Sequence, residues 1–190
     1  MPDLVAEASI SHPKILAVSR SSDHQFSKTC ETSIELVAGF SVVGDAHYGA
    51  TVQHRSRVAI DPARPNLRQV HLLSGELLQE LQQQSMQVQP GQLGENILTA
   101  GIDLLDLPKD ARLQIGASAV IEITGLRNPC RQIETFRAGL LDKVLSRDVN
   151  GDLVRRAGVM AIVLESGVIR PGDEIIVQLP PRPFVRLEPV

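Results

Sequence analysis

The stretch RLQIGASAVIEIT, residues 112–124, contains two short runs in which apolar and polar side chains alternate. Leu113 and Ile115 fall on one face of the first run, and Ile121 and Ile123 fall on one face of the second. Alternation over about four to eight residues is typical of a β-strand with one buried face. We therefore expect strands over residues 112–115 and 118–124.

Other segments have the alternating or continuous apolar patterns of strands: residues 33–38, 68–73, 159–164 and 173–179. The run 159–164 is apolar throughout, which suits a strand buried on both sides. Two helices are expected, over residues 76–83 after the candidate N-cap Ser74 and over residues 135–146. Short strands at irregular spacing with few helices predict a mainly β fold, a closed or nearly closed β-barrel with a few peripheral helices.

The length of 190 residues fits a single domain. We expect its core at about residues 33–179. Residues 1–13 are expected to form a loose N-terminal arm. Residues 180–190 form a Pro-rich tail that cannot continue a strand ladder.

Composition excludes several classes of protein. The chain has 19 Lys and Arg against 22 Asp and Glu, a net charge of −3, so it lacks the basic surface that nucleic acids or anionic membranes attract. Four Phe, one Tyr and no Trp leave few stacking platforms for single-stranded nucleic acid. No apolar run is long enough to span a membrane, and Asp3 and Glu7 interrupt any secretory signal. We expect a soluble protein of the reducing cytoplasm.

The segment TGLRNPCRQ, residues 124–132, places a cysteine at an expected helix start. Asn128 is a good N-cap and Pro129 suits the first helical position, so Cys130 is expected in the first turn. The free N–H groups there, together with Arg127 and Arg131, favour a thiolate, which is both a nucleophile and a metal ligand. The alternative is that this cysteine is a small buried apolar residue, as free cysteines usually are.

The other cysteine, Cys30, has no such setting, because Glu31 beside it opposes ionisation; we interpret it as structural. Two cysteines 100 positions apart cannot form a disulfide framework or a zinc ribbon.

Two polar loops are further candidates for a binding site. Residues 90–96, PGQLGEN, include two glycines that would let backbone N–H groups approach a ligand, although on their own a plain hairpin turn explains them better. Residues 44–57 concentrate His, Asp and Arg; His47 and His54 lack the further ligands that a structural zinc site needs. We expect a polar loop lining a pocket, with arginines that bind a phosphate or carboxylate or that simply lie on the surface: Arg55, Arg57 and Arg68.

Taken in order, these segments resemble the MOSC domain, a family named after the C-terminal domain of molybdenum cofactor sulfurase. The matching motifs are Gly44-Asp45-Ala46-His47, Arg68-Gln69-Val70-His71-Leu72-Leu73, Gly91-Gln92-Leu93-Gly94-Glu95-Asn96, Asn128-Pro129-Cys130, Gly158-Val159-Met160-Ala161 and Gly167-Val168-Ile169-Arg170-Pro171-Gly172-Asp173.

The resemblance implies a β-barrel that binds the molybdenum cofactor, a molybdopterin, with the cysteine at a pocket. It also implies one of two activities: reduction of N-hydroxylated small molecules with Cys130 as molybdenum ligand, or sulfur transfer with a persulfide on Cys130. The pyridoxal phosphate desulfurase domain of the full sulfurase is lacking, so pyridoxal phosphate is expected only on a separate partner. Sulfur or electrons would likewise come from a separate donor protein.

The resemblance assigns Cys130 as catalytic residue and metal ligand, and as cofactor-binding residues Gly94, Glu95, Asn96, His47, Arg55, Arg57, Arg68 and Arg131. We expect Cys130, Glu95 and Asn96 to line one cleft, with His47 and at least one arginine nearby, because loops at one end of a barrel converge. Glu95 would accept hydrogen bonds from the pterin or only cap its turn. Three functions stay open: an oxidoreductase, a sulfur carrier, and a non-catalytic binding protein on the same barrel.

Overall fold

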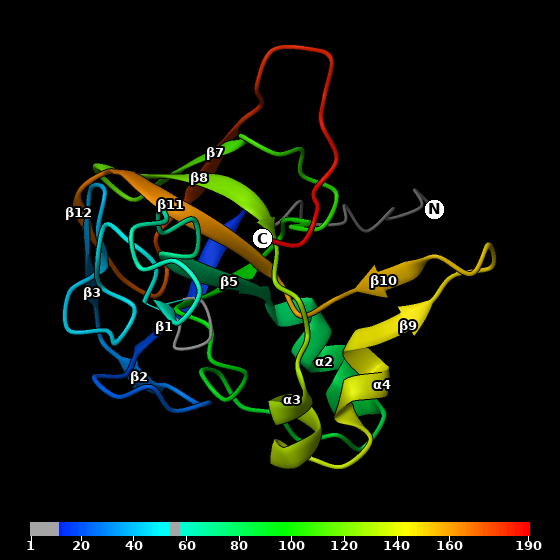
Figure 1. Cartoon of the computed structure of the whole chain (residues 1–190). Helices are drawn as coiled ribbons and strands as arrows, with labels where there is room; N and C mark the ends of the chain where they lie inside the picture. The colour runs from blue at the N-terminus through cyan, green and yellow to red at the C-terminus, as the bar shows by residue number, and fades with distance from the viewer. Residues whose placement is uncertain (1–11, 54–57) are drawn as a thin grey trace, which may run out of the picture.

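The computed structural model describes residues 12–53 and 58–190 and consists mainly of β-strands (Figure 1). Eight strands form the main sheet, in the spatial order β13-β7-β8-β11-β5-β6-β1-β2. Neighbours in this sheet run antiparallel except β5 and β6, which run parallel. The strands are β1 (Lys14–Arg20), β2 (Thr29–Glu31), β5 (Val70–Ser74), β6 (Ile97–Ala100), β7 (Arg112–Ile115), β8 (Ala119–Leu126), β11 (Val159–Glu165) and β13 (Ile175–Gln178).

Two small sheets accompany the main one. One has the order β12-β3-β4, and the other is the hairpin β9–β10, which projects from the body of the molecule in Figure 1. Their strands are β3 (Ile34–Val37), β4 (Ser41–Val42), β9 (Leu145–Arg147), β10 (Leu153–Arg155) and β12 (Gly167–Ile169). The strand segments expected from the sequence are therefore found, with small differences at their ends.

The expected closed barrel is not formed. The main sheet is open, and no strand ladder joins β2 to β13 within the described ranges. A single bridge pairs Lys14, at the start of β1, with Glu174, just before β13. The prediction of a mainly β protein with few helices is confirmed. Of the predicted closed or nearly closed barrel, full closure is not found, because a single bridge does not make a ladder.

The three helices of the described chain are α2 (Gly75–Gln83), α3 (Arg131–Phe136) and α4 (Leu140–Val144). Ser74 caps α2 as expected, since its Oγ accepts a hydrogen bond from the Leu77 N–H at 3.3 Å. The prediction of one continuous helix over residues 135–146 is wrong. Gly139, with φ of 78°, separates α3 from α4, and β9 begins at Leu145. None of these helices is long and apolar enough to cross a membrane.

The hydrophobic residues form two cores, and β5 contributes to both. Val70 and Leu72 belong to the core enclosed by the sheets, while Leu73 belongs to the core beneath the helices. Side chains of successive strand residues point to opposite faces, so an apolar run such as Val70–Leu73 serves two cores at once.

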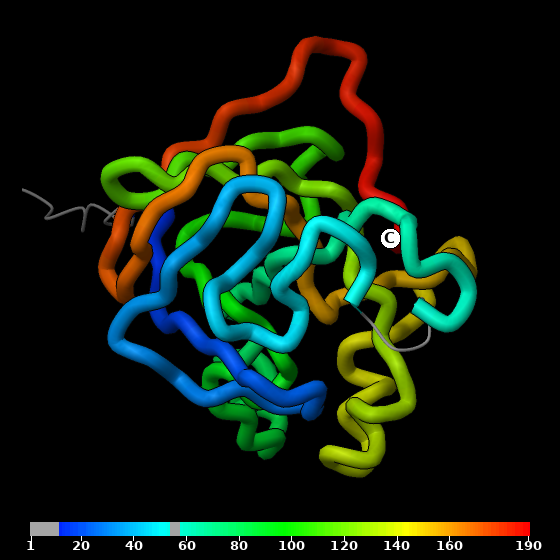
Figure 2. Tube along the Cα trace, turned by 60° about the vertical axis from the view of Figure 1, so that its left-hand side comes forward, coloured from blue at the N-terminus to red at the C-terminus, as the bar shows by residue number. Residues whose placement is uncertain are grey.

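The tail, residues 180–190, arches away from β13 and returns to the end of β8 (Figure 2). The Leu126 N–H donates to the Glu188 carbonyl at 2.8 Å, and the Val190 N–H donates to the Leu126 carbonyl at 3.2 Å. Next to this contact, a Cβ on Gly125 would lie 2.4 Å from the Glu188 carbonyl oxygen. The tail therefore fits against β8 only because residue 125 has no side chain.

Candidate functional site

Cys130 lies where β8 leads into α3, and its side chain is exposed. The N-cap of α3 is Cys130 rather than Asn128, so the helix begins two residues later than predicted. The Cys130 side chain makes no capping hydrogen bond. Asn128 is not the cap; its side-chain oxygen accepts a hydrogen bond from Arg155 Nε at 3.1 Å. Because α3 has only six residues, the helix start contributes less to the cysteine's surroundings than the sequence indicated.

Arg127, three residues before Cys130, is a buried cation. The residue is 9% exposed. Its backbone N–H donates to the Gly158 carbonyl, and its guanidinium lies 5.8 Å from the centre of the Phe26 ring. Its Nη1 has no hydrogen-bond partner in the described chain. Burial lowers the pKa of Arg127, while the charges of Cys130 and Glu95 raise it. One guanidinium therefore interacts with both the cysteine and the carboxyl group.

Glu95 is a buried carboxyl group, and one of its two oxygens has no hydrogen-bond partner in the described chain. It is 1% exposed, and its Oε1 accepts a hydrogen bond from the Gly91 N–H at 2.5 Å. No described group pairs with Oε2. Burial raises the pKa of Glu95, although the Gly91 hydrogen bond and the Arg127 charge oppose this.

The glycine turn before Glu95 serves packing. A Cβ on Gly91 would lie 2.4 Å from the Lys28 carbonyl oxygen, and one on Gly94 would lie 2.6 Å from the Phe26 carbonyl oxygen. The Gly94 N–H donates to the Gly91 carbonyl at 3.0 Å. Because the N–H groups of both glycines have partners within the turn, they do not form the free anion cradle that the sequence suggested. The cofactor contact of Gly94 stays a prediction.

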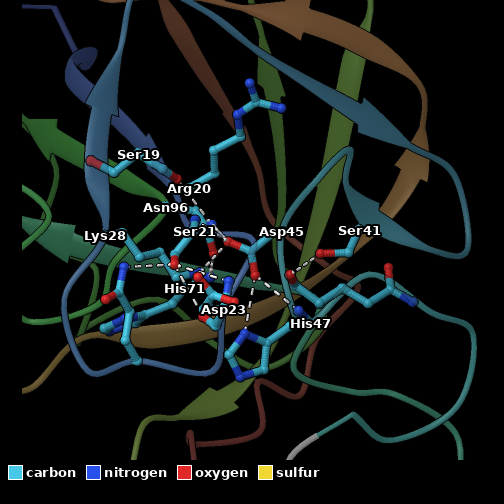
Figure 3. A network of polar contacts seen from close by, with 12 residues as sticks. Ser19, Arg20, Ser21, Asp23, Lys28, Ser41, Asp45, His47, His71 and Asn96 are labelled. Carbon is cyan, nitrogen blue, oxygen red and sulfur yellow. Dashed lines mark hydrogen bonds and ion pairs between the residues drawn. The ribbon is translucent and has the colours of Figure 1, made fainter.

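Asp45 is the centre of a hydrogen-bond network shown in Figure 3. Its Oδ2 accepts hydrogen bonds from Lys28 Nζ at 2.7 Å, from Asn96 Nδ2 at 3.0 Å and from the Ser21 N–H at 3.3 Å. Its Oδ1 lies 3.0 Å from both the backbone nitrogen and the ring Nδ1 of His47. Burial opposes the ionisation of Asp45, yet the His47 hydrogen bond and the Lys28 charge hold its pKa far below the usual range. Asp45 is thus an ionised, buried carboxylate that accepts all of these hydrogen bonds.

His71, on β5, is buried. Its backbone N–H donates to Asn96 Oδ1 at 3.2 Å, and its ring Nε2 lies 2.8 Å from the Ala157 carbonyl oxygen. Burial and the charge of Arg127 hold the pKa of His71 well below its usual value. The ring is therefore neutral at physiological pH, and its Nε2–H donates to Ala157.

Four of the nine residues predicted for one site share interaction partners in the structure, namely Cys130, Glu95, Asn96 and His47; that they line one cleft stays a prediction. Hydrogen bonds connect Asn96 to His47 through Asp45, and Glu95 and Cys130 both act on Arg127. Lys28 interacts electrostatically with Asp45, Glu95 and Arg127, which connects the two groups.

The remaining predicted arginines are less central. Arg68 precedes β5 and is partly buried, and its backbone N–H donates to Asn66 Oδ1 at 3.1 Å. Arg131 is exposed at the first position of α3, next to Cys130. Arg55 and Arg57 lie outside the described residues.

Of two cavities in the described chain, the second borders the cluster at Gly158, whose carbonyl accepts the Arg127 N–H. The first, of about 440 Å³, is beneath the tail and is lined by Lys109, Arg112 and Pro181 among others. The second, of about 370 Å³, lies between α2 and Leu104. Among the described residues, no group of three or more His, Cys, Asp or Glu side chains could hold a metal ion, so a metal here would need ligands from a cofactor.

Sequence reasoning missed Lys28 and the central position of Asp45. Asp45 belongs to the motif that carries the family resemblance, which was a usable signal. Lys28 belongs to no motif, and its partner Asp45 lies 17 positions away. Arg127 was predicted to flank the cysteine, but its burial could not be read from the sequence.

These features define a mainly β protein with an exposed cysteine beside a buried cluster of charged groups. A family model described as the MOSC domain matches residues 44–176, more than half of the chain, and the chain belongs to the MOSC domain family. No curated protein gives a significant match.

Solved structures support the same fold. YuaD from Bacillus subtilis is similar with a TM-score of 0.72 at 21% identity, covering 90% of this chain and 98% of that one. YiiM from Geobacillus stearothermophilus has a TM-score of 0.58 at 14% identity, covering 87% of this chain and 75% of that one. YiiM from Escherichia coli has a TM-score of 0.55 at 15% identity, covering 90% and 73%.

Proposed function

We propose that this protein binds the molybdenum cofactor beside Cys130 and is an oxidoreductase that reduces small N-hydroxylated compounds, with electrons from a separate donor protein. One observation carries the proposal: Glu95 Oε2 and Arg127 Nη1 are both buried and without partners in the described chain, in a cluster that includes the exposed Cys130. Leaving a buried polar group unpaired costs about 1–3 kcal/mol, so such groups call for a ligand or another explanation.

The side chains present fit the chemistry of this cofactor. Its molybdenum is held by the dithiolene sulfurs of a pterin, and the soft thiolate of Cys130 suits such a metal. Glu95 Oε2, which has no partner in the described chain, can accept a hydrogen bond from an N–H group of a pterin. Arg127 Nη1, likewise without a partner there, can donate to an anionic group. Arg131 remains a candidate for a further anionic contact, since it is exposed and adjacent to Cys130.

Each side chain has a separate part in this proposal. When bound, the cofactor supplies two-electron redox chemistry at its metal. Cys130 would hold the metal through Sγ, and Arg127 would interact with both Cys130 and Glu95 through its charge. Burial raises the pKa of Glu95, while the Gly91 hydrogen bond and the Arg127 charge favour its ionised, accepting form.

The test is metal analysis of protein purified anaerobically from a host that makes the cofactor. We expect about one molybdenum per chain in the wild type and in Cys30→Ser, the matched control, because Cys30 is exposed but has no contact with Arg127 or Glu95 among the hydrogen bonds described. Cys130→Ser should lose most of the metal. Wild-type protein without molybdenum, or Cys130→Ser with the full content, would overturn the proposal.

The exposure of Cys130 favours a second candidate, a sulfur carrier that holds a persulfide on this cysteine. An exposed thiol is accessible to a separate cysteine desulfurase. After incubation with such an enzyme and cysteine, the intact mass of a carrier should show one added sulfur, and Cys130→Ser should show none. An unchanged wild-type mass would exclude this function.

A further inference from the structure

We propose that His47 is the residue through which protons pass between solvent and this site, and that Asp45 and Lys28 position it. The inference rests on the proposed function, because it assigns the proton source for the same reaction. It starts from the network in Figure 3, in which His47 is joined directly to Asp45.

His47 lies at the boundary between solvent and the buried charges. Its side chain is 28% exposed, whereas that of Asp45 is 1% exposed and that of Lys28 is 6% exposed. Of these three linked side chains, only His47 has substantial access to water. A residue that exchanges protons with solvent while touching a buried network must lie at such a boundary.

The contact with Asp45 fixes the tautomer of the His47 ring. An ionised carboxylate can only accept hydrogen bonds, so the ring Nδ1, 3.0 Å from Asp45 Oδ1, must carry the hydrogen. The backbone N–H of His47 donates to the same oxygen, which fixes the ring's position. Nε2 is then the nitrogen that takes up and releases protons.

Asp45 is itself held in place from the other side. Lys28 Nζ and Asn96 Nδ2 both donate to its Oδ2, so this oxygen is occupied and Oδ1 is left for His47. The buried ammonium of Lys28 also keeps Asp45 ionised. Lys28 therefore acts on His47 through Asp45, as a positioning residue.

The buried titratable groups nearby are unsuited to this exchange. His71 is buried, its Nε2–H is bound to the Ala157 carbonyl, and it stays neutral. Glu95 and Arg127 are buried. The charged or titratable groups closer to solvent are His24, with its ring centre 5.3 Å from that of His47, and the Arg20–Glu31 ion pair on the β1–β2 edge.

The proposed reaction requires a proton source. Reduction of R–NH–OH to R–NH2 breaks the N–O bond, forms one N–H and one O–H bond, and releases water. It takes two electrons, which the separate one-electron donor protein supplies in two steps, and two protons. The imidazolium form of His47 gives up each proton from Nε2 and regains one from solvent.

The first test needs no cofactor. Ring ¹⁵N chemical shifts should show the neutral His47 ring mainly as the Nδ1–H tautomer in wild-type protein and in His24→Gln. The double variant Lys28→Met/Asp45→Leu removes the buried ion pair as a unit, which avoids leaving one charge unpaired. In that variant the preference for Nδ1–H should be lost. A wild-type ring that is mainly Nε2–H would overturn the inference.

The second test uses molybdenum-loaded protein, benzamidoxime as the N-hydroxylated probe and reduced methyl viologen as the electron donor. His47→Gln should keep its molybdenum and its KM within about twofold, while kcat falls about 100-fold or more, the usual contribution of a general acid. His24→Gln, the control, should keep the wild-type rate.

The two possible failures can be told apart. A wild-type protein without molybdenum, or one that is loaded but does not reduce the probe, overturns the proposed function and this inference with it. A loaded His47→Gln with wild-type kcat overturns the inference alone. Equal loss of rate in His24→Gln also overturns it, because the effect would then not be specific to His47.

Discussion

Replacing Gly125 by alanine should detach the tail from β8. The new Cβ would lie 2.4 Å from the Glu188 carbonyl oxygen and 2.6 Å from Val190 Cγ1, and both atoms belong to the tail. β8 is paired on its other side with β11, through Leu126 and Val159 among other residues, so the tail is the part that moves. The change removes two backbone hydrogen bonds, those joining Leu126 to Glu188 and to Val190.

Each such hydrogen bond contributes about 0.5–1.5 kcal/mol, so Gly125→Ala should lower the free energy of unfolding by about 1–3 kcal/mol. Urea unfolding of a double-mutant cycle with deletion of residues 188–190 measures the effect. In the truncated protein the alanine meets neither tail atom, and it should be neutral or stabilising by about 0.4–1 kcal/mol, because it restricts the unfolded chain. If Gly125→Ala destabilises the truncated protein as much as the full chain, the clash lies elsewhere and the reasoning is wrong.

Three further predictions concern the cap, the buried charge and the cysteine. Ser74→Ala should lower the unfolding free energy by about 1 kcal/mol, measured in urea, because the Leu77 N–H loses its cap; an unchanged midpoint would contradict this. Asp45→Asn leaves Lys28 unpaired and should cost about 3–5 kcal/mol at pH 7. Since the folded-state pKa of Asp45 is depressed, its charge stabilises the fold fully above the unfolded pKa of about 4, and this stabilisation is lost progressively as pH falls below that value; urea midpoints from pH 7 to pH 3 that show a constant difference would contradict the assignment. Cys130→Ser should change stability by less than about 0.5 kcal/mol, because the side chain is exposed, and a larger loss in thermal unfolding would indicate a packing role.

The sequence predicted six of the thirteen strands of the described chain, because the pattern of these six is local. The alternation over residues 112–115 matches β7 (Arg112–Ile115), whose Leu113 and Ile115 are fully buried. The helix over residues 135–146 failed because the leucine spacing fits a helix, whereas Gly139 adopts a left-handed conformation and Leu145 pairs with Arg155 across the β9–β10 hairpin. Pairing with a partner strand outside residues 135–146 leaves no trace in their own periodicity.

The site was predicted in part for a similar reason. Cys130, Glu95 and Asn96 lie in motifs that the sequence shows, and the cluster of buried charges includes or adjoins all three. The hydrogen bond from Asn96 to the Ser19 carbonyl spans 77 positions, and the one from Lys28 to Asp45 depends on how a loop folds back. Such contacts follow from the sheet topology, which composition and spacing do not determine.

The position of β5 between the two cores has a consequence for motion. Val70 and Leu72 pack into one core and Leu73 into the other, while His71 of the same strand reaches the site. Exposing the backbone of β5 to solvent would require both cores to separate, so its amide hydrogens should exchange only when the whole domain unfolds. The backbone of β5, which carries His71, should therefore open only when the protein as a whole unfolds.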